Sequence, residues 1–167
     1  ALQVVQVLGA EGIWLSPELN LAQIAQLSED APVALGAKVY GAQELMVTEH
    51  CLLTSQGPCA ETCATCTRRR VPFSLKDRKG YLFPVVTDEA GRSHLYNAVT
   101  TDLVPDLPAL IRCGITRFMV DTTLMDVEQT SQAIGRVKHA LKLALEGGEA
   151  VPKMPNTTSG HLHRGIQ

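Results

Sequence analysis

Four of the five cysteines lie within sixteen residues, and they are the most chemically specific feature of the sequence. The segment HCLLTSQGPCAETCATC carries them at Cys51, Cys59, Cys63 and Cys66. Thiolates are soft ligands, and C-x3-C and C-x2-C steps let sulfurs of one short loop converge on a single centre. The segment therefore predicts a metal or iron–sulfur site, with a disulfide-bonded loop or free thiols as alternatives. Cys113 lies far along the chain and fits a small core residue.

A basic stretch follows the cysteines directly. Six of the fifteen basic residues occupy twelve positions: Arg68, Arg69, Arg70, Lys76, Arg78 and Lys79. Asp77 is the only opposing charge, so the local field attracts phosphate or carboxylate groups. We expect this stretch to bind substrate, either an RNA backbone or an anionic small molecule, with a solvated loop as the alternative.

Bulk properties narrow the class of protein. The chain has 167 residues, of which 45% are hydrophobic and 19% charged, as in an ordinary globular domain with a core. A net charge of −2 excludes a generally basic nucleic-acid binder. No apolar run reaches the length of a membrane span, and the amino end lacks the zones of a secretory signal. We therefore expect a cytoplasmic protein with reduced thiols and no membrane partner.

Strand-like and helix-like patterns alternate along the chain. Apolar runs predict strands at 12–16, 33–40, 45–48 and 115–120, and helical spacing predicts helices at 21–27, 103–111 and 126–147. Asn20 with Gln23, and Asp126 with Gln129, form capping boxes before the first and last helices. Residues 81–87 and 93–99 flank a turn sequence, DEAG, and predict a β-hairpin.

These elements predict an α/β fold with parallel strand–helix units, an inserted antiparallel hairpin and a Cys-rich loop. We expect residues 1–150 to form a single domain, with the Cys-rich loop at 51–66 and the hairpin region at 81–99, and residues 151–167 to form an extended tail. A complete eight-unit barrel needs more chain, and the apolar start at Ala1 favours a piece cut from a larger barrel. The strand edges of such a piece predict self-association into a homo-oligomer.

Carboxylates at strand ends are the other candidate site residues. The carboxyl edge of a parallel sheet collects the site in such folds, which makes Glu18, Glu49 and Asp121 candidates. We expect Glu18 or Asp121 to assist proton transfer, with helix capping or solvent exposure as the alternative. Near the carboxyl end, the SGHLHRG segment contains His161, His163 and Arg164, which could bind an anion or a metal ion. The alternative is that this segment is a surface loop without such a role.

Five segments in one order carry a family resemblance. They are LSPELNLAQI, KVYGAQELMVTEHC, the C-x3-C pair, LKDRKGYLFPVVTDEAGRSHLYNA and SGHLHRG. Together they resemble peptidase family U-32, the collagenase-like proteins, over nearly the whole chain. The resemblance corresponds to the carboxyl-terminal part of the family's core domain, so a missing amino-terminal part of the same chain is an expected partner.

The resemblance implies a TIM-barrel-like domain and a [4Fe-4S] cluster. Better understood members look like iron–sulfur proteins that hydroxylate RNA bases or quinone precursors without oxygen, whereas older descriptions call the family proteases. By resemblance, Cys51, Cys59 and Cys63 are cluster ligands. The fourth ligand is Cys66, a position near Val104, or a residue of the missing amino-terminal region. The sequence departs from the family pattern at MVDTTLMD, where many members show a KIEGR-like run.

Three functions follow as hypotheses. The first is a cluster enzyme that modifies an RNA base or a small aromatic precursor, with the basic stretch holding the substrate. The second is a protease, for which the sequence offers only His50 beside Cys51 and no G-x-S-x-G or H-E-x-x-H motif. The third is a structural zinc module whose loop stiffens a binding surface.

Overall fold

The structure is a computed structural model, and it describes residues 2–59 and 62–164. The chain divides into two compact units. One contains Ala1–Gly41 with Thr100–Gln167, and the other contains Ala42–Val99. The range 1–150, predicted as a single domain, is therefore interrupted by a unit that has its own sheet.

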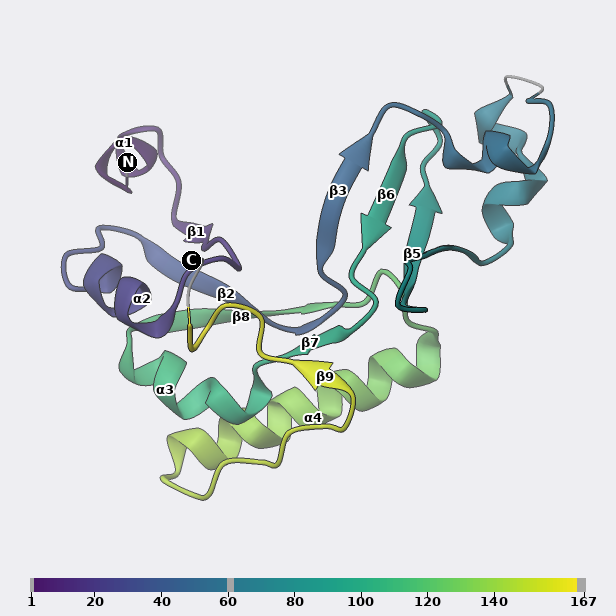
Figure 1. The fold of residues 1–167 in the computed structure, drawn as a ribbon. Coiled ribbons are helices and arrows are strands. Elements are labelled where there is room, and N and C mark those ends of the chain that lie inside the picture. Colours follow the sequence, from purple (N-terminus) through teal and green to yellow (C-terminus); the bar gives the residue numbers. More distant parts are fainter. Residues whose placement is uncertain (1, 60–61, 165–167) are drawn as a thin grey trace. The chain divides into compact units, whose positions relative to one another are not determined.

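The first unit is a mixed α/β arrangement (Figure 1). Its strands are β1 (Gly12–Trp14), β2 (Ala34–Gly41), β7 (Thr100–Asp102), β8 (Ile115–Asp121) and β9 (Thr157–Thr158). Its helices are α1 (Leu2–Val7), α2 (Leu21–Ser28), α3 (Leu107–Arg112) and α4 (Val127–Leu145), with the 3-10 turn η4 (Val104–Asp106). Strand β2 pairs in parallel with β1 and β8 and antiparallel with β7, which pairs in parallel with β9. The α/β class is confirmed, and closure into a barrel stays a prediction.

The core of this unit lies between its sheet and helices α3 and α4 (Figure 1). Leu107 and Leu110 are three positions apart, so both point from α3 to the same side, and both are fully buried. They meet Leu35 and Val39 of β2 and Ile115 of β8 in one apolar cluster. This cluster packs β2 and β8 against α3.

Both predicted capping boxes are present. Asn20 Oδ1 accepts from the Gln23 N–H at 2.9 Å, and the Gln23 side chain accepts from the Asn20 N–H at 3.0 Å. Asp126 and Gln129 repeat this exchange at the start of α4, at 2.8 and 3.0 Å. Each box satisfies two N–H groups that the first helical turn leaves without a partner. No helix in the described ranges is both long and apolar enough to cross a membrane.

The segment predicted as an extended tail returns to the first unit. Leu162 is only 3% exposed and belongs to the core cluster. Asp102, with no exposure, accepts from both terminal nitrogens of Arg136 at 2.9 and 3.0 Å and from the Met154 N–H at 3.0 Å. A buried carboxylate needs such partners, so this cluster holds α4 and the tail against β7.

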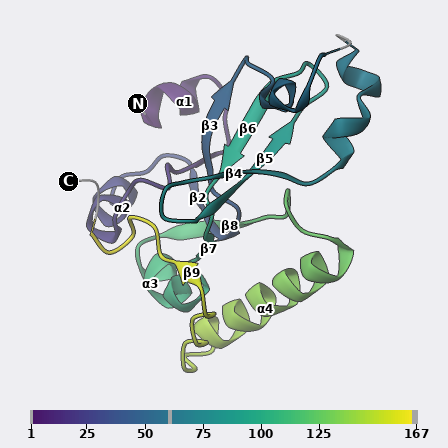
Figure 2. The same ribbon diagram turned by 45° about the vertical axis from the view of Figure 1, so that its right-hand side comes forward.

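The second unit is an antiparallel sheet with the order β3-β6-β5-β4, which Figure 2 shows from a second direction. Its strands are β3 (Glu44–Thr48), β4 (Phe73–Lys76), β5 (Leu82–Thr87) and β6 (Ser93–Tyr96). The 3-10 turns η1 (Leu52–Gln56), η2 (Cys63–Thr65) and η3 (Thr67–Arg70) carry the cysteines between β3 and β4. The predicted hairpin is confirmed as β5 and β6, whereas β4 adds a second hairpin that the sequence pattern did not predict.

Candidate functional site

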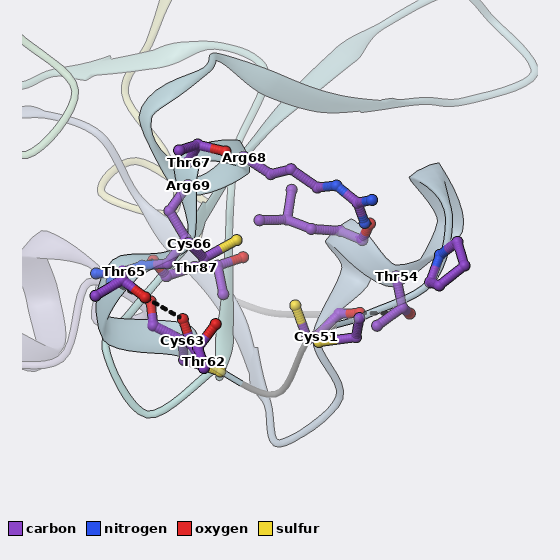
Figure 3. A pocket seen from close by; sticks show the side chains of 13 residues that line it. Cys51, Thr54, Thr62, Cys63, Thr65, Cys66, Thr67, Arg68, Arg69 and Thr87 are labelled. Carbon is purple, nitrogen blue, oxygen red and sulfur yellow. Dashed lines mark hydrogen bonds between the residues drawn. The ribbon is translucent and has the colours of Figure 1, made fainter.

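The four clustered cysteines line one pocket of about 270 Å³ in the second unit. Threonines and two arginines complete its wall, and Figure 3 shows the sulfurs of Cys51 and Cys66 turned into the space between two segments of the loop. All five cysteines are free of disulfides. Cys113 instead packs against the core of the first unit, in the role expected for it. The four thiols thus line one cavity, and their role as ligands stays a prediction.

Cys51 is positioned by the end of the antiparallel sheet. The Leu52 N–H donates to Ser93 Oγ at 2.9 Å, and Ser93 is fully buried. The Thr54 hydroxyl donates to the Cys51 carbonyl at 2.8 Å, which closes the turn that follows. Ser93 also shares a hydrogen bond of 3.2 Å with the Thr87 hydroxyl, which lines the pocket. These hydrogen bonds fix the backbone that follows the Cys51 thiol.

Cys63 rests against the turn between β5 and β6. Gly91 in that turn has φ of +85°, a conformation that favours glycine. A Cβ added at Gly91 would lie 2.8 Å from Cys63 Sγ, which is too close for two such atoms. Glycine at this position therefore serves both the turn and the placement of the Cys63 thiol.

Arg68 and Arg69 hold the cysteine-bearing turns through backbone carbonyls. Arg69 donates to the Cys63 carbonyl at 2.7 Å and to the Thr87 carbonyl at 2.9 Å. Arg68 donates to the Gly57 carbonyl at 3.0 Å. Both arginines also line the pocket. These two arginines act on the pocket wall, which sequence reasoning missed because backbone partners leave no motif.

Within residues 2–59 and 62–164, no three histidine, cysteine, aspartate or glutamate side chains are grouped so as to hold a single metal ion. The four thiols surround a cavity rather than a point. Cys59 is exposed and the other three are half-buried. The metal or cluster site expected from the cysteine spacing therefore stays a prediction.

Three of the remaining four basic candidates lie away from the pocket. Arg70 is exposed at the end of η3, while Lys76, Arg78 and Lys79 are exposed on the β4–β5 hairpin. Lys76 pairs with Leu82 at one end of β5, and Thr87 lies at the other. Five residues of strand separate these ends by about 17 Å. The structure therefore divides the basic stretch into two groups.

Of the strand-end carboxylates, Glu18 and Asp121 belong to the first unit and Glu49 belongs to the second. Asp121 ends β8, where its Oδ1 accepts from the Thr123 N–H at 3.0 Å and its Oδ2 lies 3.7 Å from Lys38 Nζ. Glu18 is exposed in the segment before α2. Their predicted part in proton transfer stays a prediction. In the carboxyl-terminal segment, His163 Nε2 lies 3.0 Å from Asp106 Oδ1, so this side chain has a protein partner.

A charge network at the outer end of the second sheet also escaped sequence reasoning. His94 Nδ1 lies 2.8 Å from Glu44 Oε2, and its Nε2 lies 3.4 Å from Asp88 Oδ2. The hydrogen bond to Glu44 outweighs desolvation and raises the pKa of His94. Desolvation opposes ionisation of Asp88, but hydrogen bonds from Arg92 and His94 outweigh it and lower its pKa to about 2. Only the cross-strand pairing, which the sequence does not give, brings these groups together.

The comparisons place the whole chain in one family match. The model of peptidase family U32 matches residues 1–167. No curated protein and no solved structure matches the chain. The match covers both units, so the cysteine pocket and the strand-end carboxylates lie within it.

Proposed function

The chain belongs to peptidase family U32, and from this premise we propose that it is part of an iron–sulfur enzyme that hydroxylates an RNA base or a small aromatic precursor. The residues that would hold a [4Fe-4S] cluster are Cys51, Cys59, Cys63 and Cys66. When bound, such a cluster supplies electron-transfer chemistry. One observation carries the proposal: four thiols from a span of sixteen residues line a single pocket.

The pocket favours a cluster over zinc for a geometric reason. A structural zinc ion draws four ligands to one point at about 2.3 Å for sulfur. The described side chains offer no such group of three for any metal ion. A cluster is favoured by the volume of about 270 Å³ lined by the thiols, which leaves space for a centre larger than one zinc ion. Arg68 and Arg69 supply two positive charges at its wall, which offset the charge of bound thiolates.

The other residues take roles that their positions allow. The hydroxyls of Thr62, Thr65 and Thr67 line the same pocket and offer hydrogen bonds to a polar edge of a substrate. Arg70 is exposed next to this wall and is available to an anionic group. Glu18 or Asp121 would move a proton during the reaction, as part of the same proposal.

Iron retention by cysteine variants tests the proposal. Anaerobic reconstitution with iron and sulfide should yield a brown protein, and serine at Cys51 or Cys63 should remove most of the bound iron. Cys113→Ser is the matched control, because it deletes a thiol of similar burial outside the pocket. Equal iron retention by the pocket variants and the control would contradict the assignment.

Peptide hydrolysis is the second candidate, and the family's description as a peptidase favours it. A cysteine protease needs a base within hydrogen-bonding reach of the thiol. In the described ranges no hydrogen bond joins His50 to Cys51; the His50 N–H bonds to Thr48 Oγ1 instead. Peptide cleavage that disappears in Cys51→Ala and persists without iron would favour this alternative.

A further inference from the structure

Two hairpin turns of the second unit share one backbone design. Asp77 Oδ1 accepts from the N–H groups of Lys79 and Tyr81, both at 2.8 Å. Asp88 Oδ1 accepts from the N–H groups two and four residues later, both at 2.9 Å. Each turn has a glycine with positive φ before its last residue, Gly80 and Gly91. The two turns can therefore be compared position by position.

The two turns treat charge differently. In the Asp88 turn, the fifth residue is Arg92, whose guanidinium lies 2.7 Å from the Asp88 carboxylate. In the Asp77 turn, the fifth residue is Tyr81, so no guanidinium returns to the carboxylate. Lys76, Arg78 and Lys79 are all exposed and form no ion pair with any residue in the described ranges. In the Asp88 turn, Arg92 neutralises the carboxylate, whereas the Asp77 turn exposes three cations to solvent.

Apolar surface accompanies these cations. Tyr81 is 52% exposed and Leu82 is 57% exposed. Leu82 pairs across the strands with Lys76, so an apolar side chain and a cation share one face of the hairpin end. Cations beside an exposed aromatic ring are the combination with which proteins hold single-stranded nucleic acid, by phosphate contacts and base stacking.

The distance between the pocket and the hairpin end distinguishes a small anionic ligand from a polymeric one. The hairpin end lies about 17 Å along β5 from Thr87 in the pocket wall. A small molecule held between the cysteines cannot reach the hairpin cations. A strand with stacked bases rises about 3.4 Å per nucleotide, so about five nucleotides cover that separation.

We propose that the end of the β4–β5 hairpin is a binding site for single-stranded nucleic acid, with Lys76, Arg78 and Lys79 contacting phosphates and Tyr81 stacking on a base. This inference deepens the proposed function and rests on it for the use of the pocket. It assigns Arg68 and Arg69 to the pocket wall and the hairpin cations to a polymeric substrate. An unpaired strand is required because a base must leave its duplex to enter a pocket.

Binding of a labelled oligonucleotide tests the site. Fluorescence anisotropy of a single-stranded RNA of about ten nucleotides, long enough to cover the separation, would be compared among variants of the full chain. Lys76→Gln, Arg78→Gln and Lys79→Gln combined should flatten the slope of log affinity against log salt by about 2, at roughly 0.7 per phosphate contact. Tyr81→Ala should weaken binding about tenfold and leave that slope unchanged.

The matched control combines Arg112→Gln, Lys138→Gln and Lys142→Gln, which removes three exposed cations from the first unit. This variant has the same net charge as the hairpin variant and should bind like the unsubstituted chain. DNA of the same sequence distinguishes the two sources of a phosphate strand, and a mononucleotide should bind far more weakly than either. Circular dichroism confirms that each variant is folded.

Equal loss in the control and hairpin variants would overturn the site, because it would show a response to net charge alone. No binding by the unsubstituted chain at low salt would overturn it as well, as would a mononucleotide that binds as tightly as the strand. Iron content is measured on the same preparations. A hairpin variant that retains iron and loses RNA binding separates this site from the pocket, and unaltered RNA binding in a chain that takes up no iron refutes the cluster without refuting the hairpin site.

Discussion

Substitution of Gly91 by alanine isolates the contact between the β5–β6 turn and Cys63. The residue has φ of +85°, so any side chain there costs about 1–2 kcal/mol of backbone strain. A Cβ would also lie 2.8 Å from Cys63 Sγ, and the thiol must move to relieve that overlap. We expect Gly91→Ala to lower the free energy of unfolding by about 2 kcal/mol or more and to reduce iron retention sharply.

Gly80→Ala is the control that separates strain from displacement. Gly80 holds the equivalent place in the Asp77 turn, with φ of +90°, and its added Cβ would meet only Lys76 Cε at 3.8 Å. It should lose about 1–2 kcal/mol in urea unfolding and retain iron fully. Iron content after anaerobic reconstitution and the rate of thiol alkylation are the assays. Unchanged iron content in Gly91→Ala, or an equal loss in Gly80→Ala, would refute the role given to this contact.

Three further predictions concern the pocket wall, the charge network and the core. Arg69→Gln removes donors to two carbonyls, so it should lower the free energy of unfolding of the chain by about 2 kcal/mol and release iron, whereas Arg70→Gln, at an exposed position, should do neither. The pKa of His94 is raised above 6.5 in the folded chain, so the contribution of His94 to stability is fully present below pH 6.5 and is lost as pH rises through the folded pKa. The pKa of Asp88 is lowered to about 2, so the contribution of Asp88 is present above pH 3.8 and is lost as pH falls toward 2. Urea unfolding from pH 2 to 9 measures both, and His94→Gln should remove the loss on the alkaline side; a profile identical to that of the unsubstituted chain would contradict the network. Leu107→Ala should cost about 2–5 kcal/mol in the first unit, and a loss under 1 kcal/mol, measured by thermal unfolding, would contradict its place in the core.

Local sequence signals predicted much of the secondary structure. The capping boxes at Asn20 and Asp126 predicted the starts of α2 and α4, and the DEAG turn predicted the hairpin of β5 and β6. These features depend on residues within a few positions of one another. Strand β4 was missed because it has only four residues and lies at a sheet edge, where three of them are exposed.

Long-range pairing accounts for what the sequence did not show. The apolar runs that became β2 and β3 are close in the chain, yet they belong to different units and different sheets. The pairing of β4 with β5 likewise carries Lys76 away from Arg69, although seven positions separate them in sequence. Nothing in residue spacing alone predicts that division.

The sequence pointed to the four cysteines of the pocket but not to the residues that position them. Cysteine spacing placed four thiols together, and the structure gathers them around one pocket. Ser93, Gly91 and Arg69 position that loop through a hydroxyl, an absent side chain and two backbone carbonyls. Such contacts leave no sequence motif, because their partners are backbone groups that every residue carries.

Iron, acid-labile sulfide and zinc content of the anaerobically reconstituted chain tests the central claim most directly. A [4Fe-4S] cluster held by the four pocket cysteines predicts about four irons and about four sulfides per chain, with zinc near zero. One zinc per chain with no iron under any preparation, or no metal uptake at all, would contradict it.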